Sequence, residues 1–397
     1  MKKEGIESIS LFTSSFLGAE SEEVIDGVRV VRAGDKYSVY RQARKFYDRN
    51  QNSFDVVVDE INTKPFDTPS YVRDKPIIAL VHQLAREFWF YETKFPINVI
   101  GYLFLENYWL RKYRELPTVT VSASTRDDLL KIGFNRVLIV PEGLGFKPLE
   151  TIPEKEIVPT VLFVGRLKKA KKPDDAVRAF KIIKDEVPRA KFWIVGDGYM
   201  MNELKEMTYR LFGTPHQLER NAGMEKLRVS QEKARVSNQH HNNKSVLPPT
   251  FNSHGDAKLG SLETGEVVRF FGKVSSDEKL ELMARAHVLL VPGVREGWGL
   301  VVTEANAMGT TVVAYDVPGL RDAVIDGVTG ILVPNGDVVS MAIEAIELFK
   351  NEGKMQAFFT RALKAAKSFD WNNTSDHFAH ILSQSVAERQ ENHEIRS

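Results

Sequence analysis

The segment Ala286–Gly309, AHVLLVPGVREGWGLVVTEANAMG, constrains the fold more than any other part of the sequence. Its apolar run Val288–Val291 stops at Pro292-Gly293, a pattern typical of a buried parallel strand. A glycine-containing turn follows, and Leu300–Met308 then has helical spacing. In open parallel sheets this kind of junction faces the ligand crevice, and the free N–H groups of the helix's first turn can hold a phosphate. The segment therefore predicts a strand–turn–helix unit that binds a phosphorylated ligand.

Similar strand patterns recur along both halves of the chain and alternate with helical or loop segments. A stretch rich in Pro, Glu and Lys at residues 146–159 separates the two halves and predicts a linker. Because strands and helices alternate in a similar way in both halves, we predict an α/β fold with two doubly wound domains that face each other across a cleft, residues 1–148 and 149–365. In the first half the predicted strands are Ile6–Thr13, Val28–Arg32, Phe54–Val58, Pro76–His82, Thr118–Val121 and Val137–Val140. In the second half they are Val161–Val164, Lys191–Val195, Arg269–Phe271, Val288–Val291, Thr311–Tyr315 and Gly330–Val333.

Charge and cysteine content exclude several classes of function. Among 397 residues, 54 Lys and Arg balance 53 Asp and Glu, so no global field attracts nucleic acid. The absence of cysteine excludes disulfides, thiolate metal sites and cysteine nucleophiles, and it fits a cytoplasmic protein. No signal peptide pattern is present, and no apolar run approaches the roughly 18 residues of a membrane span.

Residues 212–266 interrupt the α/β pattern with a polar, unpatterned stretch, which predicts a disordered insert. The adjacent His240 and His241 lie in this stretch without acidic or cysteine partners at ligand spacing, so we predict no metal site.

Residues 84–116 are rich in aromatic side chains. One interpretation is a set of aromatic helices packed on a sheet. The other is an apolar acceptor groove or a surface for peripheral contact with the inner face of a membrane.

Charged residues follow two predicted strands of the second half. Glu296 lies in the turn after one strand and Glu304 lies inside the next helix, where their carboxylates could accept sugar and ribose hydroxyls. Arg166 follows another strand, with Lys171 and Lys172 in the same loop. Helix glutamates and lysine runs are ordinarily solvated, but these lie at junctions predicted to share one crevice. Together the cations would neutralise a leaving diphosphate without a metal.

Five motifs in this order resemble the large group 1 family of glycosyltransferases, which retain anomeric configuration and have the GT-B fold. They are GRLKKAKKP, IVGDG, FFGKVSSDEKLELMARAHVLLVPG, EGWGLVVTEANAMG with its Glu-x7-Glu spacing, and VPGLRDAVIDGVTGILV. The first half is similar through VHQ, SAST and PEGLG, and residues 366–397 resemble the family's last helix, which crosses back to the first domain.

The resemblance implies a nucleotide-diphosphate sugar as the donor substrate, no cofactor, and a saccharide or lipid-linked acceptor. It assigns the diphosphate to Arg166 and Lys171, the transferred sugar to Glu296, the ribose to Glu304, and a place beside the sugar and acceptor to His82. Neither glutamate is assigned as a nucleophile, because the family works by front-face attack. The implied donor-binding residues are Gly165, Lys172, Gly196, Gly272, Val274, Gly297, Trp298, Gly299, Leu300, Val301 and Glu304.

The family's opening strand and glycine-rich loop are not found before Ile6, so the first domain is expected to lack them. The alternative to an active transferase is therefore a non-catalytic relative that binds nucleotide sugar or a protein partner. A phosphorylase-like enzyme would need a lysine motif for pyridoxal phosphate, which is not recognisable. A glycosidase using Glu296 and Glu304 would leave the basic cluster unexplained.

Overall fold

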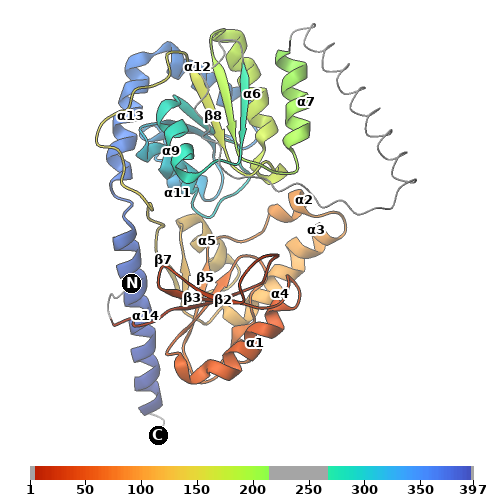
Figure 1. Ribbon diagram of the computed structural model, residues 1–397, viewed down its shortest axis with the longest axis vertical. Coiled ribbons are helices and arrows are strands. Elements are labelled where there is room, and N and C mark those ends of the chain that lie inside the picture. Colours follow the sequence, from red (N-terminus) through yellow and green to blue (C-terminus); the bar gives the residue numbers. More distant parts are fainter. Residues whose placement is uncertain (1–4, 214–266, 395–397) are drawn as a thin grey trace, which may run out of the picture.

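The computed structural model describes residues 5–213 and 267–394, in two α/β halves joined at one side by the long helix α14 (Trp371–Glu394) (Figure 1). Residues 214–266, which hold most of the predicted insert and both His240 and His241, lie outside the described part.

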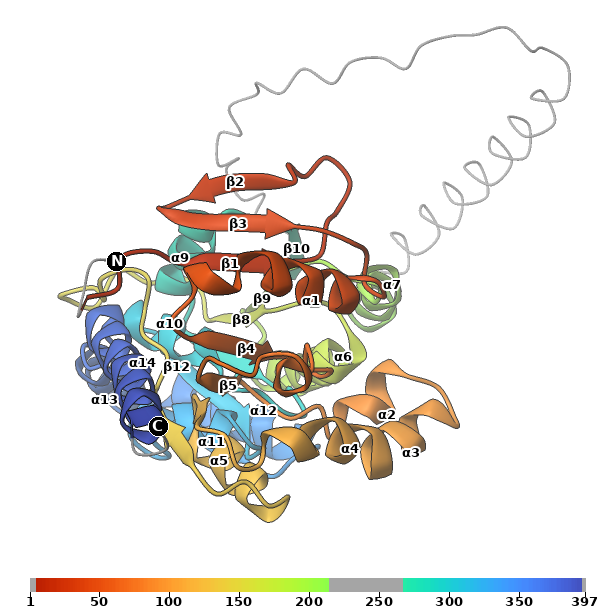
Figure 2. The ribbon, with the colours of Figure 1, turned by 90° about the horizontal axis from the view of Figure 1, so that it is seen from below.

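The strands of the N-terminal half form two sheets. β1 (Ser10–Thr13), β2 (Glu22–Ile25) and β3 (Val28–Arg32) make one sheet in the order β1-β3-β2. β4 (Val57–Ile61), β5 (Ile77–Val81), β6 (Thr118–Thr120) and β7 (Val137–Ile139) make a second, wholly parallel sheet in that order. Figure 2 shows the two sheets following one another, with β1 and β4 on the facing edges.

The strands described in the N-terminal half are thus divided between two hydrogen-bonded sheets. β2 is acidic and short, and it pairs antiparallel with β3 through a turn in which Asp26 and Gly27 both have positive φ, the requirement of a tight hairpin. No described strand joins β1 to β4. The absence of the family's opening strand and loop stays a prediction.

β4 also corrects the predicted strand Phe54–Val58, since it starts at Val57 and continues through Asp59 and Glu60. An acidic pair argues against a buried strand, but Asp59 is 1% exposed and accepts the hydroxyl hydrogens of Tyr113 at 2.5 Å and Thr68 at 2.8 Å. Tyr113 lies 54 residues and Thr68 nine residues after Asp59, so neither is visible in the local periodicity, which ends the strand too early.

The C-terminal half has one parallel sheet of six strands in the order β10-β9-β8-β11-β12-β13. Its strands are β8 (Thr160–Val164), β9 (Lys191–Val195), β10 (Val268–Gly272), β11 (Val288–Val291), β12 (Thr311–Tyr315) and β13 (Gly330–Val333). β8 is central: the chain first extends the sheet on one side of it and then turns to the other side with β11. A ligand crevice is therefore expected beyond the carboxyl ends of β8 and β11.

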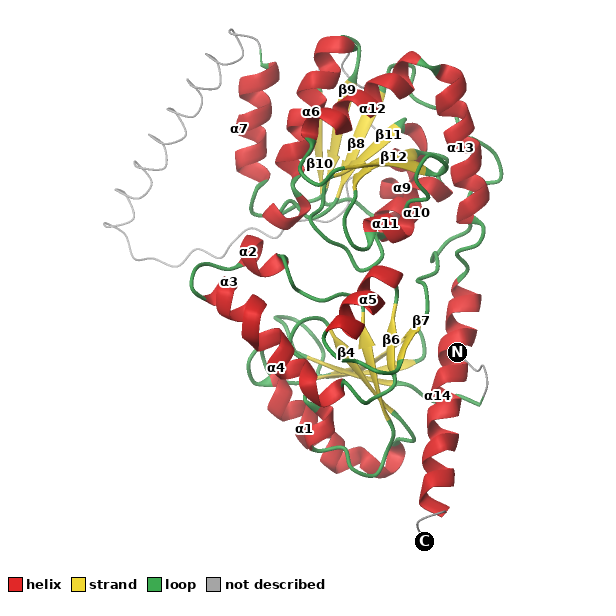
Figure 3. Cartoon of the chain, turned by 180° about the vertical axis from the view of Figure 1, so that it is seen from behind, coloured by secondary structure: helices red, strands yellow, loops and turns green. Residues whose placement is uncertain are grey.

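Helices cover both faces of this sheet (Figure 3). α6 packs against α12, and α10 packs against α13. The helices of this half are α6 (Pro173–Glu186), α7 (Met201–Phe212), α9 (Ser276–Arg285), α10 (Leu300–Ala307), α11 (Leu320–Ala323), α12 (Val338–Lys350) and α13 (Glu352–Ala366).

The helices of the N-terminal half include α1 (Val39–Asn50), α2 (Phe88–Glu92), α3 (Ile97–Ile100), α4 (Glu106–Leu110) and α5 (Ala123–Lys131). α14 continues from the C-terminal half along the four-stranded sheet of the N-terminal half, where Ile381 packs with Ile78 and Val119. An ion pair of 2.9 Å between Arg136 and Glu388 lies further along the same helix. α14 thus ties the two halves together on the side of the linker.

Candidate active site

A cavity of about 520 Å³ lies between the two halves, at the carboxyl ends of β8 and β11. The cavity lies where the strand order of the six-stranded sheet of the C-terminal half reverses. The N-terminal half contributes Glu60, Asn62, His82, Gln83 and Glu142. The C-terminal half contributes Phe163, Val164, Gly165, Arg166, Lys171, Lys279, Val291, Pro292, Gly293, Glu296, Gly297, Trp298, Gly299, Leu300, Val301 and Glu304.

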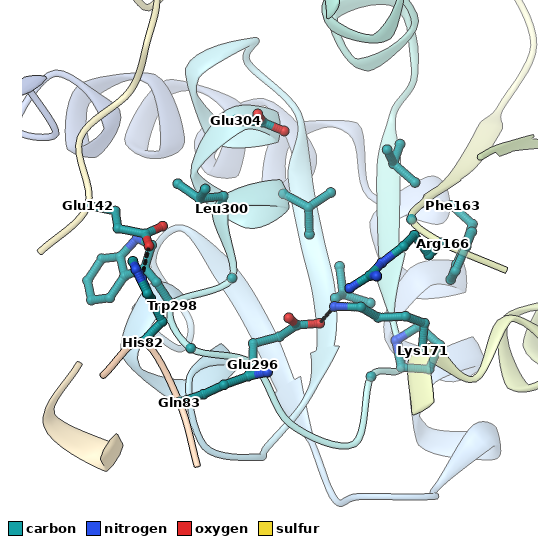
Figure 4. Close-up of a pocket in the computed structure, with 18 of the residues that line it drawn as sticks. His82, Gln83, Glu142, Phe163, Arg166, Lys171, Glu296, Trp298, Leu300 and Glu304 are labelled. Carbon is teal, nitrogen blue, oxygen red and sulfur yellow. Dashed lines mark hydrogen bonds and ion pairs between the residues drawn. The ribbon is translucent and has the colours of Figure 1, made fainter. Parts of the chain in front are cut away.

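Two cations enter this cavity from the loop after β8. Arg166 lies just after β8, separated from its last residue by Gly165, and Lys171 closes the short 3-10 turn Lys169–Lys171 (Figure 4). Nζ of Lys171 donates to the carboxylate of Glu296, with side chains 21% and 14% exposed. In the free protein the two groups therefore neutralise one another at the cavity wall.

The turn between β11 and α10 brings backbone donors to the same wall. Gly299, the residue before α10, has φ of 90°, a conformation that favours glycine. α10 then starts at Leu300, and the first N–H groups of a helix have no partner within it. The positive end of the helix dipole and these N–H groups face the cavity, so an anionic group of a ligand is stabilised here.

Glu304 lies one turn further into α10 and is held by Lys279 of α9, with 2.6 Å between Nζ and Oε1. Both side chains are about three-quarters buried or more, at 25% and 19% exposed, and both line the cavity. The pair presents one acceptor group and one donor group side by side, which suits a ligand with vicinal hydroxyls.

His82 faces them from the end of β5 in the N-terminal half. Its Nδ1 lies 2.9 Å from Glu142 and its Nε2 lies 3.5 Å from Glu60. Hydrogen bonds to Glu142 and then to Glu60 raise the pKa of His82 from 6.5 to about 9, although burial works in the opposite direction. At neutral pH the ring is therefore an imidazolium held between two carboxylates, and it is not a free base.

Most of the residues that the sequence analysis names come together in this cavity. The members found there are His82, Gly165, Arg166, Lys171, Glu296, Gly297, Trp298, Gly299, Leu300, Val301 and Glu304.

Four other named residues, Lys172, Gly196, Gly272 and Val274, are not among the residues that line the cavity. The side chain of Lys172 turns back to Asp175, 3.2 Å away, because the residue has a left-handed backbone at the start of α6. Gly196 packs so tightly that an added Cβ would lie 1.9 Å from the carbonyl oxygen of Gly165. Gly272 ends β10, the edge strand, and its carbonyl accepts from the N–H of Gly196.

Three charged residues of the cavity are not predicted from the sequence: Glu60, Glu142 and Lys279. Glu142 follows β7 and Pro141 at the same sheet edge as His82, so its position after a strand was a usable signal. Lys279 lies inside an amphipathic helix among other charged residues, and no sequence signal separates it from the solvated face.

No described helix is long and apolar enough to cross a membrane. Within residues 5–213 and 267–394, no group of three or more His, Cys, Asp or Glu side chains has an arrangement that could hold a metal ion.

The sequence matches the family "Glycosyl transferases group 1" over residues 147–218 and 256–365. It is 29% identical over 237 residues to D-inositol 3-phosphate glycosyltransferase of Salinispora tropica, covering 60% of this chain and 40% of that one. It is 34% identical over 108 residues to phosphatidyl-myo-inositol mannosyltransferase of Mycobacterium leprae, covering 27% of this chain and 29% of that one. The aligned regions thus span well under half of these curated relatives.

Two solved structures share the fold across most of the chain. Sucrose-phosphate synthase from Thermosynechococcus elongatus superposes with a TM-score of 0.65 at 16% identity, covering 96% of this chain and 89% of that one. Anabaena HepE, solved with UDP and glucose, superposes with a TM-score of 0.59 at 14% identity, covering 89% and 85%. At these identities the similarity concerns the fold, which is that of the GT-B glycosyltransferases.

Proposed function

Since the chain belongs to the group 1 glycosyltransferases through residues 147–218 and 256–365, we propose that it transfers a hexosyl group from a nucleotide-diphosphate sugar to a saccharide or lipid-linked acceptor. We propose further that the transfer retains the anomeric configuration and uses neither a metal nor another cofactor. One observation carries the proposal: the cations Arg166 and Lys171, the N-terminus of α10, and the carboxylates of Glu296 and Glu304 line a single cavity at the switch point of the sheet.

The donor half of the cavity suits a sugar diphosphate. Arg166, Lys171 and the N–H groups at the start of α10 would bind the diphosphate and stabilise the charge that develops as it leaves. Glu304 would accept the ribose hydroxyls and Glu296 the hydroxyls of the transferred sugar. The base would lie beyond the diphosphate, toward residues 272–274 at the end of β10. Relatives of this fold have been solved with UDP and glucose, which supports a nucleotide sugar as the donor class.

The bond between the anomeric carbon and the diphosphate oxygen breaks during transfer. The acceptor oxygen bonds to the same face of that carbon, and its proton passes to the leaving diphosphate. His82 does not serve as the base in this scheme, because both ring nitrogens already face carboxylates. Instead, the His82 cluster with Glu142 and Glu60 would form the acceptor side of the cavity.

A panel of UDP-, GDP- and ADP-sugars tests the proposal through release of the nucleotide diphosphate in the presence of simple saccharide, polyol and lipid acceptors. Wild-type protein should release one diphosphate, and Arg166→Ala and Glu304→Ala should each abolish the release. Lys350→Ala, which removes an exposed ion pair with Glu186 far from the cavity, is the matched control. Full turnover by both site variants would overturn the site assignment.

The alternative is a relative that binds nucleotide sugar without transferring it. The division of the N-terminal strands into two unjoined sheets favours this alternative, because the acceptor side of the cavity depends on that half. Calorimetry that finds donor binding, together with no transfer to any acceptor of the panel, would select it.

A lipid-linked acceptor has independent support in an exposed apolar surface on α2–α4, which project from the side of the N-terminal half (Figure 2). We call this surface the aromatic face. It consists of Phe90, Phe95, Ile97, Ile100, Leu103, Phe104 and Tyr108, between 44% and 81% exposed. Exposed Lys94, Arg111 and Lys112 flank it. Aromatic side chains beside basic ones are typical of peripheral contact with an anionic membrane, and one relative is by name a phosphatidyl-myo-inositol mannosyltransferase.

Sedimentation with vesicles of phosphatidylglycerol and phosphatidylcholine tests the aromatic face. Replacing Phe95 and Phe104 by Ser should lower vesicle binding. The control is Ile157→Ser, because Ile157 is 93% exposed but lies in the linker. Equal binding by the wild type and the double variant would exclude the aromatic face as a membrane contact.

A further inference from the structure

Arg295 lies immediately before Glu296 in the turn after β11, yet its side chain points to the other half of the molecule. Its Nε donates to Glu87 at 2.6 Å, and its Nη1 donates to Asp128 of α5 at 2.9 Å. The Arg295 side chain is 4% exposed, whereas Glu87 is 46% and Asp128 17% exposed. A buried guanidinium with two carboxylate partners from 167 and 208 residues away is a fixed bridge between the halves.

The N-terminal partners are themselves held in place. The segment before α2 is fixed by buried Glu106, which accepts the backbone N–H groups of Ala85 at 2.5 Å and Arg86 at 3.2 Å. Glu87 follows these two residues directly. On the other side, Asp128 also contacts Lys131 at 3.1 Å, an exposed lysine that cannot replace a buried guanidinium. The carboxylates of Glu87 and Asp128 are thus held in position to accept hydrogen bonds from Arg295.

The rest of the same turn is fixed to the cavity. The backbone N–H of Val294 donates to Ala170 in the 3-10 turn that carries Lys171, at 3.0 Å. The backbone N–H of Glu296 donates to Pro318 at 3.0 Å, and its carboxylate contacts Lys171. If the N-terminal half moves Arg295, Glu296 is therefore displaced as well, because it is the next residue in the chain.

From this geometry we propose that Arg295 is a positioning residue: its bridge to Glu87 and Asp128 holds Glu296 where it meets the transferred sugar. The inference rests on the proposed function, in which Glu296 accepts sugar hydroxyls. In that function Arg166, Lys171, the N-terminus of α10 and Glu304 bind the nucleotide diphosphate, and Glu296 does not. Loss of the bridge should therefore weaken binding of the sugar part of the donor and leave binding of the nucleotide diphosphate unchanged.

Calorimetry on Arg295→Gln with two probes separates these effects. The probes are UDP and UDP-glucose, or the corresponding pair for whichever nucleotide sugar of the panel is turned over. UDP affinity should stay within twofold of the wild type, while the affinity for the nucleotide sugar falls about tenfold and kcat falls about 10- to 100-fold, as expected for a small displacement of a positioning group. Arg295→Lys keeps the charge but cannot fork between two carboxylates, so it should recover only part of the loss.

Two controls exclude a general loss of structure. Arg361→Gln removes an exposed arginine of α13 that donates to the backbone oxygen of Gly327 and lies over the ring of Phe358, and it should behave as wild type. Glu87→Gln combined with Asp128→Asn removes both carboxylate partners of Arg295. This double variant should show the same changes in affinity and kcat as Arg295→Gln. Equal affinity of wild type and Arg295→Gln for the nucleotide sugar, or an equal loss for UDP, would overturn the proposal.

A distance measurement keeps the inference separate from the proposed function. The chain has no cysteine, so spin labels can be attached at Lys45→Cys in α1 and Lys364→Cys in α13, both exposed positions, one in each half. Arg295→Gln should broaden or shift the distance distribution between the labels. If no nucleotide sugar binds the wild type, the proposed function fails, whereas an unchanged distribution shows that Arg295 does not hold the halves.

Discussion

Replacement of Gly297 by alanine is the sharpest test of how the two halves meet. Gly297 lies one residue after Glu296, and a Cβ built on it would be 2.7 Å from the carbonyl oxygen of His82, in the other half. An ordinary van der Waals contact begins at 3.4 Å, so the two backbones must separate by about 0.7 Å. Gly297 has no positive φ, so the substitution adds no backbone strain of its own. The cost arises only where the halves meet.

We expect Gly297→Ala to lower kcat/KM by about 10- to 100-fold, because a displacement approaching 1 Å at a reacting centre has effects of this size. Binding of the nucleotide diphosphate to the C-terminal half should be unchanged. Initial rates with the donor identified in the panel, calorimetry with its diphosphate, and a melting curve measure these three quantities.

The matched control is Gly353→Ala in α13, where the added Cβ would meet its nearest neighbour at 3.7 Å. This variant should keep wild-type activity. Wild-type kcat/KM in Gly297→Ala would refute the contact between His82 and the turn, and a joint loss of activity and diphosphate affinity would point to damage within the C-terminal half.

Two further predictions concern the charged pairs of the cavity. Lys279→Met should weaken binding of the nucleotide diphosphate about tenfold, the equivalent of about 1.4 kcal/mol, because it removes a charged hydrogen bond to Glu304. Lys350→Met, which removes an exposed ion pair with Glu186, is the control. An unchanged affinity of Lys279→Met would show that the pair does not help to bind the nucleotide. Glu142→Gln should destabilise the protein in a pH-dependent way, because the folded pKa of His82, about 9, lies above its unfolded value of 6.5. The stabilisation is fully present below about pH 6.5 and is lost as the pH rises through about 9. In denaturant titrations, the difference in unfolding free energy between wild type and Glu142→Gln should therefore shrink between these two pH values. A constant difference would contradict the ion pair between His82 and Glu142.

The C-terminal half is the part that sequence predicts best. Its buried parallel strands are continuous apolar runs, and Lys191–Val195, Val288–Val291 and Thr311–Tyr315 have the bounds that their patterns predict. The N-terminal half is harder because its strands carry charges. β2 is acidic and exposed, and the carboxylate of β4 that looks like a strand end is buried by hydroxyl partners distant in sequence.

The same contrast holds within the cavity. Residues that occupy strand–helix junctions, such as Arg166 and Glu296, are predicted because position along a parallel sheet determines which edge they reach. Lys279 is missed because it reaches the cavity from a helix interior, where only the packing of α9 against α10 brings it to Glu304. A local sequence pattern does not show which residues of different helices and strands pair with one another.

The turn after β11 shows why the pairing matters for function. Three successive residues of this turn contact different halves of the molecule. Arg295 contacts the N-terminal half, Glu296 contacts Lys171 in the cavity, and Gly297 again lies against the N-terminal half at His82. Glu296, for which we propose a role in binding the transferred sugar, is thus flanked by two residues that contact the opposite half. If the halves separate, both flanking contacts are lost together, and Glu296 keeps only its local contacts. Under the proposed function, donor sugar binding and contact between the halves should therefore be coupled through three consecutive residues. For this reason we expect Arg295→Gln and Gly297→Ala to fail in the same way, although one removes a charge and the other adds a methyl group.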